Sequence, residues 1–337
     1  MILNIPTHLA DKIKSIPHKP GVYKMKDSRG NIIYIGKSKC LSKRVKSYFQ
    51  VNHEWEKIKR LVFNIHDIDF IVTDTHLEAQ LLECELIKRY KPIYNSQFAK
   101  DRNYVYLKIE ECMTDNPLSI TMEKCEKYIF GPFRSKRAIG DLITLMLKLY
   151  PIKKNKGLYT IQYSSLPRVM NEKEFEENKK CLIEIFSNEK YMETFINLLE
   201  EKMKEASSCF RFERASCFRD ILLTMKYIYI SQKNNITKDK RIIMGEKIDE
   251  GYILFYIYDG NLIMKKKFNN LSIDNINEFI SQSRNLEKHF TVNMDEKSNM
   301  DFKNIINREL KDKTSKVIEM VDTNFDVKLF IDKLKKL

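Results

Sequence analysis

Two short runs rich in Tyr, Ile and Gly stand near the start of the chain and constrain its first folding unit. They cover Gly21–Lys26 and Ile32–Lys37, and the loop Asp27-Ser-Arg-Gly-Asn31 separates them. β-branched and aromatic residues favour strands, and Gly30 can take the positive φ that such a loop usually needs. The spacing therefore predicts a β-hairpin over residues 21–37.

Further helices and one strand are predicted to complete this unit. The predicted elements are a basic helix at about 41–50, a second helix at 54–64, a strand over 69–73 and a helix over 75–90. The last helix carries a stripe of Leu77, Leu81, Leu82 and Leu86, and Pro92 ends it. Residues 14–97 are therefore expected to form an α/β (α+β) domain with a small mixed sheet and flanking helices.

The rest of the chain divides into three predicted segments. Residues 98–170 combine strands, one helix and an irregular basic connector over 151–170, whereas residues 171–232 are almost entirely helical. Residues 233–337 predict a small α+β region whose role the sequence does not define, with a hairpin at Asp259-Gly-Asn261. The carboxylates of its tail are expected to be solvated surface charges: Asp274, Asp295, Asp301, Asp312, Asp322 and Asp326.

Basic residues outnumber acidic ones along the 337 residues, with 60 Lys and Arg against 46 Asp and Glu and a formal net charge of +14. Such an excess favours a polyanionic partner, nucleic acid before a membrane. Residues 1–100 alone hold 18 basic and 10 acidic residues, and the segment 37–46 has no acidic residue. The candidate DNA-binding side chains are the lysines of that segment: Lys37, Lys39, Lys43 and Lys46.

Composition also excludes several classes of protein. A hydrophobic content of 43% is enough for packed cores and excludes a wholly disordered chain. No apolar stretch reaches the ~18–20 residues of a membrane span, and the first residues do not form a secretory signal. The seven cysteines are scattered and form no C-x-x-C pair, so we expect a reduced cytoplasmic protein without a zinc site or a disulfide framework.

The first unit also carries side chains suited to phosphodiester cleavage. Arg44 offers two fixed donors to phosphate oxygens, and the Glu83 carboxylate can hold a divalent ion that keeps most of its waters. A phenol such as Tyr34 is a poor base at its free pKa of ~10, but an adjacent cation such as Lys37 or a metal-bound water favours the phenolate. Each residue also has a structural alternative: tyrosines as packing residues, basic side chains as a solvated face, and Glu83 as a helix flank.

The combination of these residues resembles the GIY-YIG nuclease family, and most closely its UvrC-like branch. The matching positions in the first half of the unit are Pro20-Gly-Val-Tyr23, Met25, Asp27, Gly30, Ile33-Tyr-Ile-Gly-Lys37, Leu41, Arg44-Val45 and Ser47-Tyr-Phe49. Those further along are Glu78-Ala79, Leu81-Leu-Glu83, Leu86-Ile-Lys88 and Lys91-Pro-Ile-Tyr-Asn95.

This resemblance implies a phosphodiesterase that uses one Mg²⁺ or Mn²⁺ ion. By the resemblance, Tyr34 is the general base, Glu83 holds the metal, and Arg44 binds the scissile phosphate. Lys37 tunes Tyr34 or holds phosphate. The residues implied to complete the pocket are Tyr23, Tyr48 and Asn95.

A second set of residues lies in the helical hairpin predicted at about 195–231. Residues 218, 221, 222 and 225 are apolar at helical spacing, which by itself indicates a hairpin packed on its own domain. The pattern around Phe212-Glu213, Ala215 and Arg219-Asp220 also resembles the UVR motif, through which excinuclease subunits B and C associate. The resemblance implies a UvrB-like helicase subunit as partner. We expect Phe212 and Phe218 to be buried and Glu213, Arg219 and Asp220 to be available for polar contacts.

The chain also departs from the UvrC-like pattern. Residues 152–170 lack the four cysteines that would hold an iron–sulfur cluster, so no such cluster is expected. About 50 residues follow position 285, too few for both the RNase H-like nuclease and the helix-hairpin-helix elements of longer members. The outline resembles the short Cho-like form of the family, which lacks the RNase H-like nuclease.

The expected function is therefore a single incision, on the 3′ side of damage in double-stranded DNA, during nucleotide excision repair. The protein is expected in the cytoplasm, associated with the nucleoid during repair and without a membrane partner. Two alternatives remain open. One is a mobile-element or phage GIY-YIG endonuclease that acts on its own site. The other is a non-catalytic adaptor that binds DNA or the UvrB-like subunit.

Overall fold

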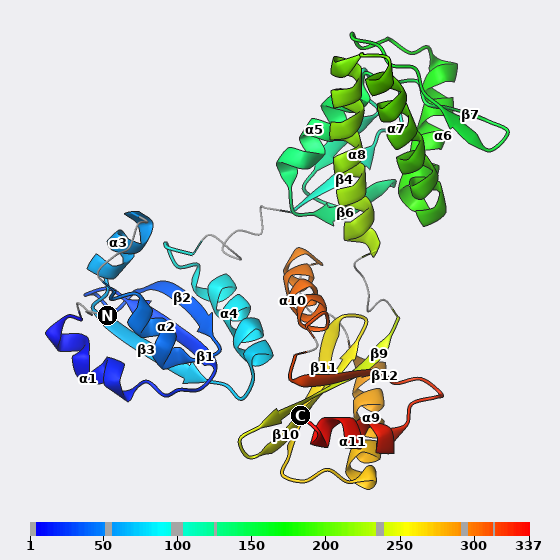
Figure 1. Cartoon of the computed structure of the whole chain (residues 1–337). Helices are drawn as coiled ribbons and strands as arrows, with labels where there is room; N and C mark the ends of the chain where they lie inside the picture. Colours follow the sequence, from blue (N-terminus) through cyan, green and yellow to red (C-terminus); the bar gives the residue numbers. More distant parts are fainter. Residues whose placement is uncertain are drawn as a thin grey trace. The chain divides into compact units, whose positions relative to one another are not determined.

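The chain folds into two compact units, residues 1–101 with 235–337 and residues 102–234 (Figure 1). The computed structural model describes residues 5–50, 56–95, 104–124, 127–233, 239–290, 296–312 and 314–337. The predicted segments 14–97 and 233–337 thus share the first unit, while most of 98–170 and 171–232 lies in the second.

The N-terminal part of the first unit is a three-layer arrangement around a small sheet. Its elements are α1 (Thr7–Ser15), β1 (Gly21–Lys26), β2 (Ile32–Ser38), α2 (Leu41–Ser47), α3 (Glu56–Phe63), β3 (Asp67–Val72) and α4 (His76–Tyr90). Helices α1, α2 and α3 share one core with the strands, and α4 shares another with Val22 and Ile35 of the sheet. Hydrophobic residues alternate between these two cores along β1, as strand geometry requires.

The strand order is β2-β1-β3, and both pairings are antiparallel. The mixed sheet expected from the sequence is therefore wrong, although the α+β class is confirmed. The physical reason is that β3 pairs with the central strand β1 and not with β2, to which it runs parallel. Helices α2 and α3 carry the chain back along the sheet, so that β3 runs opposite to the central strand β1.

The hairpin turn forms as the sequence predicts. Asp27 Oδ1 accepts hydrogen bonds from the backbone N–H groups of Arg29 and Asn31, both at 2.9 Å. Gly30 has a φ of 82°, a conformation that residues with a Cβ rarely adopt. The loop chemistry therefore sets the register that brings Tyr23 opposite Gly36.

Helix α4 begins and ends with local signals that the sequence contains. Thr75 and Glu78 form a capping box, in which each side chain bonds the backbone N–H of the other. Lys91 ends the helix in the left-handed conformation, with a φ of 46°. These signals fix the limits of the helix that carries Glu83.

The C-terminal part of the first unit is a four-stranded antiparallel sheet with three helices. The strand order is β11-β10-β9-β12. Its elements are β9 (Arg241–Ile248), β10 (Gly251–Tyr258), β11 (Asn261–Phe268), α9 (Ile273–His289), α10 (Glu296–Glu309), β12 (Lys316–Met320) and α11 (Val327–Lys335). Asp259 and Gly260 both have positive φ, at 46° and 74°, so the predicted turn joins β10 and β11.

Among the tail carboxylates that the structure describes, Asp301 differs from the expectation of solvated surface charge, and Asp295 lies outside the described residues. The Asp301 side chain is only 6% exposed and pairs with the Lys88 ammonium group at 2.7 Å. Asp301 lies on α10, and α10 packs against α4 within the first unit. This packing buries a carboxylate that helical periodicity alone placed in solvent.

The second unit combines a three-stranded sheet with a bundle of helices. The strand order is β5-β4-β6, and one hydrophobic core joins this sheet to the helices. Its elements are β4 (Val105–Ile109), β5 (Leu118–Thr121), β6 (Ile129–Phe133), α5 (Lys136–Met146), β7 (Lys153–Asn155), β8 (Leu158–Thr160), α6 (Glu172–Ser187), α7 (Glu189–Ser208) and α8 (Phe212–Lys233). The connector over 151–170 is not wholly irregular, because β7 and β8 pair as a short hairpin. Within the described residues, no helix is both long and apolar enough to cross a membrane.

Candidate nuclease site

The predicted catalytic side chains come together around one pocket of the first unit. The pocket has a volume of about 260 Å³. Tyr34 reaches it from β2, Arg44 from α2, Tyr48 from the residue after α2, and Glu83 from α4. Residues from three different elements and from the end of α2 therefore converge, as a reactive site on a small rigid scaffold requires.

Tyr48 is the centre of the polar contacts at this pocket. Its hydroxyl bonds that of Tyr23 at 2.8 Å, accepts from Arg44 Nη2 at 3.3 Å and donates to the Tyr34 hydroxyl at 3.4 Å. Because Tyr48 gives its own proton to Tyr34, Tyr23 acts as the donor to Tyr48. The Arg44 guanidinium also lies over the Tyr48 ring, 5.0 Å from its centroid. This network fixes the direction of both Tyr34 and Arg44.

Two glycines permit the close approach of these groups. A Cβ on Gly36 would lie 2.2 Å from the Tyr23 hydroxyl, and a Cβ on Gly21 would lie 2.2 Å from the carbonyl oxygen of Ile71. Neither contact is sterically possible, so any side chain at these positions would displace Tyr23 or separate β1 from β3. The glycines next to Tyr23 and Tyr34 in the two sequence runs are therefore required by packing.

Glu83 is held at the pocket by Lys37. Its carboxylate accepts from the Lys37 backbone N–H at 3.0 Å and from the Lys37 ammonium at 2.8 Å. The Lys37 ammonium thus neutralises Glu83 in this structure rather than pairing with Tyr34. Burial, the nearby Tyr48 and the Glu83 charge all raise the pKa of Tyr34 above its ordinary value. Deprotonation of Tyr34 therefore needs additional positive charge near Glu83.

Asn95 lies at the edge of the same pocket, where its side chain bonds the backbone of β2. Its Oδ1 accepts from Ile35 N at 2.9 Å, and its Nδ2 donates to Ile35 O at 2.8 Å. The side-chain amide thereby pairs with β2 as another strand would. Asn95 lines the pocket with its amide already engaged on the backbone of the strand that carries Tyr34.

The sequence analysis missed two polar residues of the pocket. Lys57 on α3 and Tyr94 after α4 both line it. Tyr94 accepts from Asn64 Nδ2 at 3.1 Å, and its backbone N–H donates to Ile33 O at 3.1 Å. Lys57 belongs to a basic, amphipathic helix, and Tyr94 stands next to Asn95, but neither pattern by itself distinguishes a pocket residue from a surface residue.

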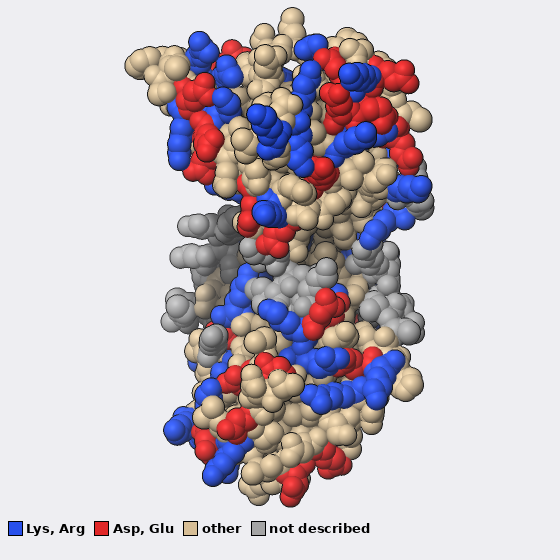
Figure 2. All heavy atoms as spheres, turned by 90° about the vertical axis from the view of Figure 1, so that its right-hand side faces the viewer, with Lys and Arg blue, Asp and Glu red and all other residues tan. Residues whose placement is uncertain are grey.

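The candidate DNA-binding lysines follow the pocket along β2 and α2. Lys39 and Lys43 are exposed, whereas Lys37 and Lys46 are partly buried. On the face drawn in Figure 2, basic and acidic side chains are interspersed over much of the described surface. The net charge of +14 is therefore not gathered into one uniform basic patch on that face, and the local segment 37–46 remains the sharper candidate.

Comparison with known proteins agrees with this arrangement. Residues 19–96 match the model of the UvrC-like GIY-YIG domain. Residues 19–96 thus form a domain of the UvrC-like GIY-YIG family. It is 37% identical over 277 residues to the UvrABC system protein C of Caldanaerobacter subterraneus subsp. tengcongensis, a match that covers 75% of this chain and 44% of that protein. The protein of the same name from Acetivibrio thermocellus is 33% identical, with 77% and 45% covered.

Solved structures of an N-terminal endonuclease domain of UvrC from Thermotoga maritima also match. One, a point mutant bound to the catalytic divalent cation, is 39% identical and covers 28% of this chain and 100% of that domain, with a TM-score of 0.25. Another, bound to magnesium, is 41% identical and covers 27% and 99%, also with a TM-score of 0.25. The chain spans less than half the length of the UvrABC system proteins that it matches.

The segment in which the sequence resembles the UVR motif folds as a long helical hairpin, α7 and α8, in the second unit. Phe218 is fully buried in the core of that unit, as expected. Phe212 is 65% exposed, so the expectation of burial is wrong for this residue. Phe210 is 80% exposed, and its ring lies 6.1 Å from that of Phe212. The reason is the turn, where Phe210 has a φ of 58° and the chain reverses before α8 begins.

The polar residues of the hairpin lie near this aromatic tip. Arg219 is exposed and bonds Asp220 Oδ1 and Ser216 Oγ, at 2.9 Å and 3.0 Å. Glu213 is also exposed. The tip thus presents two aromatic rings with Glu213 next to Phe212 in sequence, and Arg219 follows about two helical turns further along α8.

Proposed function

We propose that this chain is a metal-dependent DNA endonuclease of the UvrC type, which makes one incision on the 3′ side of damage in double-stranded DNA. The convergence of Tyr34, Arg44 and Glu83 on one pocket carries this proposal. We assign catalysis to residues 14–97 and partner binding to the hairpin at about 195–231. We assign the reaction to nucleotide excision repair, in the cytoplasm at the nucleoid.

A divalent cation fits the residues of the pocket. Glu83 supplies a mostly buried carboxylate beside an open volume, and hard oxygen ligands suit Mg²⁺, which keeps several of its waters. Among the described residues, no group of three or more His, Cys, Asp and Glu could hold a metal, so the proposal rests on a single protein ligand. The matching domain from Thermotoga maritima is named as bound to a catalytic divalent cation. Such an ion at Glu83 supplies positive charge where negative charge develops on the phosphate.

The protein's own groups perform the remaining steps. Arg44 binds non-bridging oxygens of the scissile phosphate and stabilises the charge that develops there. Tyr34, once it has lost its own proton to solvent, is a phenolate and takes the proton of the attacking water at its phenolic oxygen. Tyr48 orients both groups through its hydrogen bonds, and Tyr23 orients Tyr48. The lysines at positions 39, 43 and 46 hold the flanking backbone of the DNA.

An incision assay on a centrally damaged duplex tests this function. One strand is labelled at each end in turn, and the chain is added with Mg²⁺, with and without a UvrB-like subunit. A single nick on the 3′ side of the lesion that needs the subunit supports the proposal. Independent cutting of undamaged DNA at one sequence would instead identify a mobile-element enzyme, and binding without cutting would identify an adaptor.

The number of cuts is part of the same proposal. The residues that the structure describes bring together one nuclease constellation, around Tyr34, Arg44 and Glu83. We therefore expect one nick for each lesion. An excised oligonucleotide released by this chain and its partner, without another nuclease, would contradict the single-site proposal.

Glu83→Gln is expected to raise the Mg²⁺ concentration needed for half-maximal nicking, because a neutral amide is a weaker ligand for a hard cation. An excess of Mg²⁺ or Mn²⁺ should restore part of the rate. The measurement is the nicking rate against metal concentration. Glu85→Gln, an exposed glutamate on the same helix, is the matched control and should keep the wild-type dependence.

The partner that we propose is a UvrB-like helicase subunit, bound at the tip of the α7–α8 hairpin. Exposed aromatic rings with adjacent charges are typical anchors of protein interfaces. The double variant Phe210→Ser with Phe212→Ser is expected to weaken association by about 2 kcal/mol, roughly 30-fold. Arg219→Glu should weaken it as well, without loss of folding, because this side chain is exposed.

Binding is measured by calorimetry with the purified subunit, and folding by circular dichroism. Phe63→Ser is the matched control, since Phe63 is 89% exposed on α3 of the other unit. Unchanged binding by both hairpin variants would count against the UVR hairpin as the docking site.

A further inference from the structure

Helix α4 is apolar on more faces than the nuclease sheet can cover. Leu77, Ala79, Cys84, Leu86 and Ile87 are all buried, and they point in different directions around the helix axis. A helix that is hydrophobic all round belongs between two layers of structure. The three-stranded sheet provides only one of those layers, because a sheet contacts a single face of a helix.

The second layer comes from the C-terminal part of the same unit. Helix α10 packs on α4, and one hydrophobic core contains side chains of both parts. The members of this core that belong to the C-terminal part are Ile242, Met244, Ile253, Phe255, Ile257, Ile305, Ile306 and Leu310. We call β9–β12 with α9–α11 the brace. The helix that carries Glu83 thus lies between the nuclease sheet and the brace.

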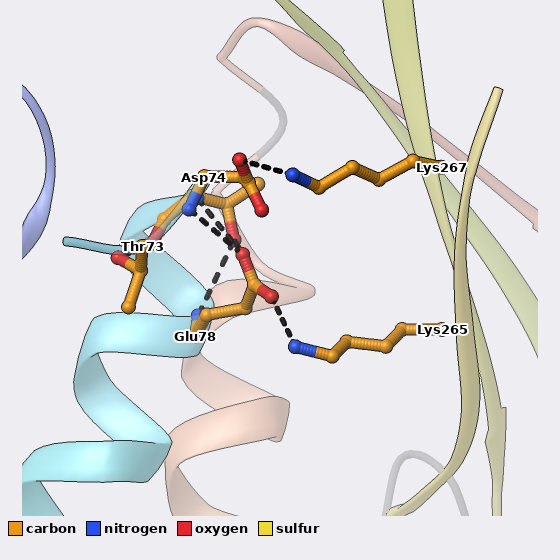
Figure 3. Close-up of polar contacts among 6 residues, drawn as sticks. Thr73, Asp74, Glu78, Lys265 and Lys267 are labelled. Carbon is orange, nitrogen blue, oxygen red and sulfur yellow. Dashed lines mark hydrogen bonds and ion pairs between the residues drawn. The ribbon is translucent and has the colours of Figure 1, made fainter. Parts of the chain in front are cut away.

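Two lysines of the brace bind the N-terminal end of α4 (Figure 3). Lys265 and Lys267 are alternate residues of β11, so both point to the same side of that strand. Lys265 Nζ bonds Glu78 Oε1, and Lys267 Nζ bonds Asp74 Oδ1 at 2.6 Å. The other oxygen of Glu78 accepts the backbone N–H groups of Asp74 and Thr75 in the capping box. The brace therefore binds the residues at the N-terminal end of α4.

Two polar contacts lie deeper along the helix. Gln80 Nε2 donates to Glu309 Oε2 at 3.1 Å, and both side chains are buried. The Lys88 ammonium lies 2.7 Å from Asp301 Oδ2, and these side chains are 15% and 6% exposed. Breaking a buried ion pair by removing one partner leaves an unpaired charge, which strongly destabilises the contact. The Lys88–Asp301 pair therefore fixes the register of α4 against α10.

We propose that the brace is a positioning element for the metal ligand: it holds α4, and with it Glu83, against Lys37 and the edge of β2. Glu83 contacts Lys37 on one side of the helix, while Glu78 and Lys88 bind the brace on another. Weakening the contacts of Glu78 and Lys88 with the brace lets α4 move, so the Glu83 carboxylate takes a wider range of positions. Because catalysis tolerates little misplacement, Lys265 and Asp301 control the nuclease site without touching DNA. The expected effect on catalysis rests on the proposed function, whereas the contacts between α4 and the brace do not depend on it.

The principal test places like charges in the buried contact of the full chain. Asp301→Lys sets a second ammonium group against Lys88, and Lys88→Asp with Asp301→Lys restores the pair in reverse. We expect Asp301→Lys to speed hydrogen exchange of the α4 amides by at least about 10-fold. The dissociation constant for Mn²⁺, measured by electron paramagnetic resonance without DNA, should rise about 10-fold. The swapped variant should recover most of both values.

A milder pair of variants covers the case in which Asp301→Lys does not fold. Lys265→Ala with Lys267→Ala removes two exposed side chains from β11 and should speed exchange in the first turn of α4. Lys266→Ala is the matched control. It lies between them on the same strand, and its ammonium group is over the Phe268 ring, 5.5 Å from the centroid, and not on α4. Exchange and Mn²⁺ binding in the control should match the wild type.

The outcomes separate the brace from the proposed function. If Glu83→Gln does not weaken Mn²⁺ binding, Glu83 is not the metal ligand. The hydrogen-exchange result would then still report on the contacts between α4 and the brace. Unchanged α4 exchange in the lysine double variant and in a folded Asp301→Lys would overturn the brace. Faster exchange without weaker Mn²⁺ binding would also overturn it, because the contacts would then be structural and not positioning.

Discussion

Arg44→Ala is expected to reduce the nicking rate on damaged duplex by about 10²–10³, the usual loss when a fixed donor to a developing charge is removed. Arg44 is anchored by its bond to the Tyr48 hydroxyl and by the Tyr48 ring beneath it. The guanidinium is therefore held in place before the phosphate binds. The water that fills its place in Arg44→Ala is not held in this way. The measurement is single-turnover nicking at saturating Mg²⁺ and partner.

Arg44→Lys tests the geometry separately from the charge. A lysine keeps the positive charge but loses the planar pair of donors, so we expect only a small part of the rate to return. The control is Arg29→Ala, an exposed arginine in the hairpin loop of the same part of the chain. If Arg44→Ala nicks within a few-fold of the wild type, Arg44 does not bind the scissile phosphate.

Tyr34→Phe is expected to lower the nicking rate by about 10²–10⁴, the usual range for a general base. The ring of Tyr34 packs beside those of Tyr23 and Tyr48, with centroids 6.1 Å away in both cases, and Phe keeps that packing. Loss of rate then reports the hydroxyl alone. Tyr90→Phe, an exposed tyrosine at the end of α4, should nick at the wild-type rate.

The nicking rate of the wild type is expected to depend on pH through the ionisation of Tyr34. Burial, Tyr48 and the Glu83 charge raise the pKa of Tyr34, so the phenolate is scarce at neutral pH. The wild-type rate should therefore increase with pH. More Mg²⁺ would add positive charge beside Glu83 and should move the profile to lower pH. A Tyr34→Phe variant that keeps the wild-type rate and profile would exclude Tyr34 as the base.

Local patterns in the sequence were sufficient for the individual elements. The Tyr- and Ile-rich runs around the Gly30 loop predicted the hairpin, the leucine stripe predicted α4, and the turn at Asp259 predicted the pairing of β10 and β11. These features depend on residues within a few positions of one another. Their energetics are short-range, so a single sequence contains the information.

The candidate site was predicted as a set of residues but not as an arrangement. The sequence indicated Tyr34, Arg44 and Glu83, which the structure brings to one pocket. It indicated Lys37 as a partner of Tyr34, whereas its ammonium group binds Glu83. The difference arises because Lys37 and Glu83 are 46 positions apart in the sequence, and only the packing of helix α4 on β2 brings them together. Periodicity does not encode which of two nearby acceptors a flexible lysine reaches.

The sequence by itself thus determined most of the helices and strands, the two hairpin turns, the α+β class and the residue types of the candidate site. Only the tertiary structure decided that the small sheet is antiparallel, that Phe212 is exposed, that Asp301 is buried and that α4 is enclosed by the brace. The physical reason is the range of the contacts involved. Caps and turns are stabilised within one segment, whereas burial of Asp301 by Lys88 joins residues more than 200 positions apart, and only the folded chain brings them together.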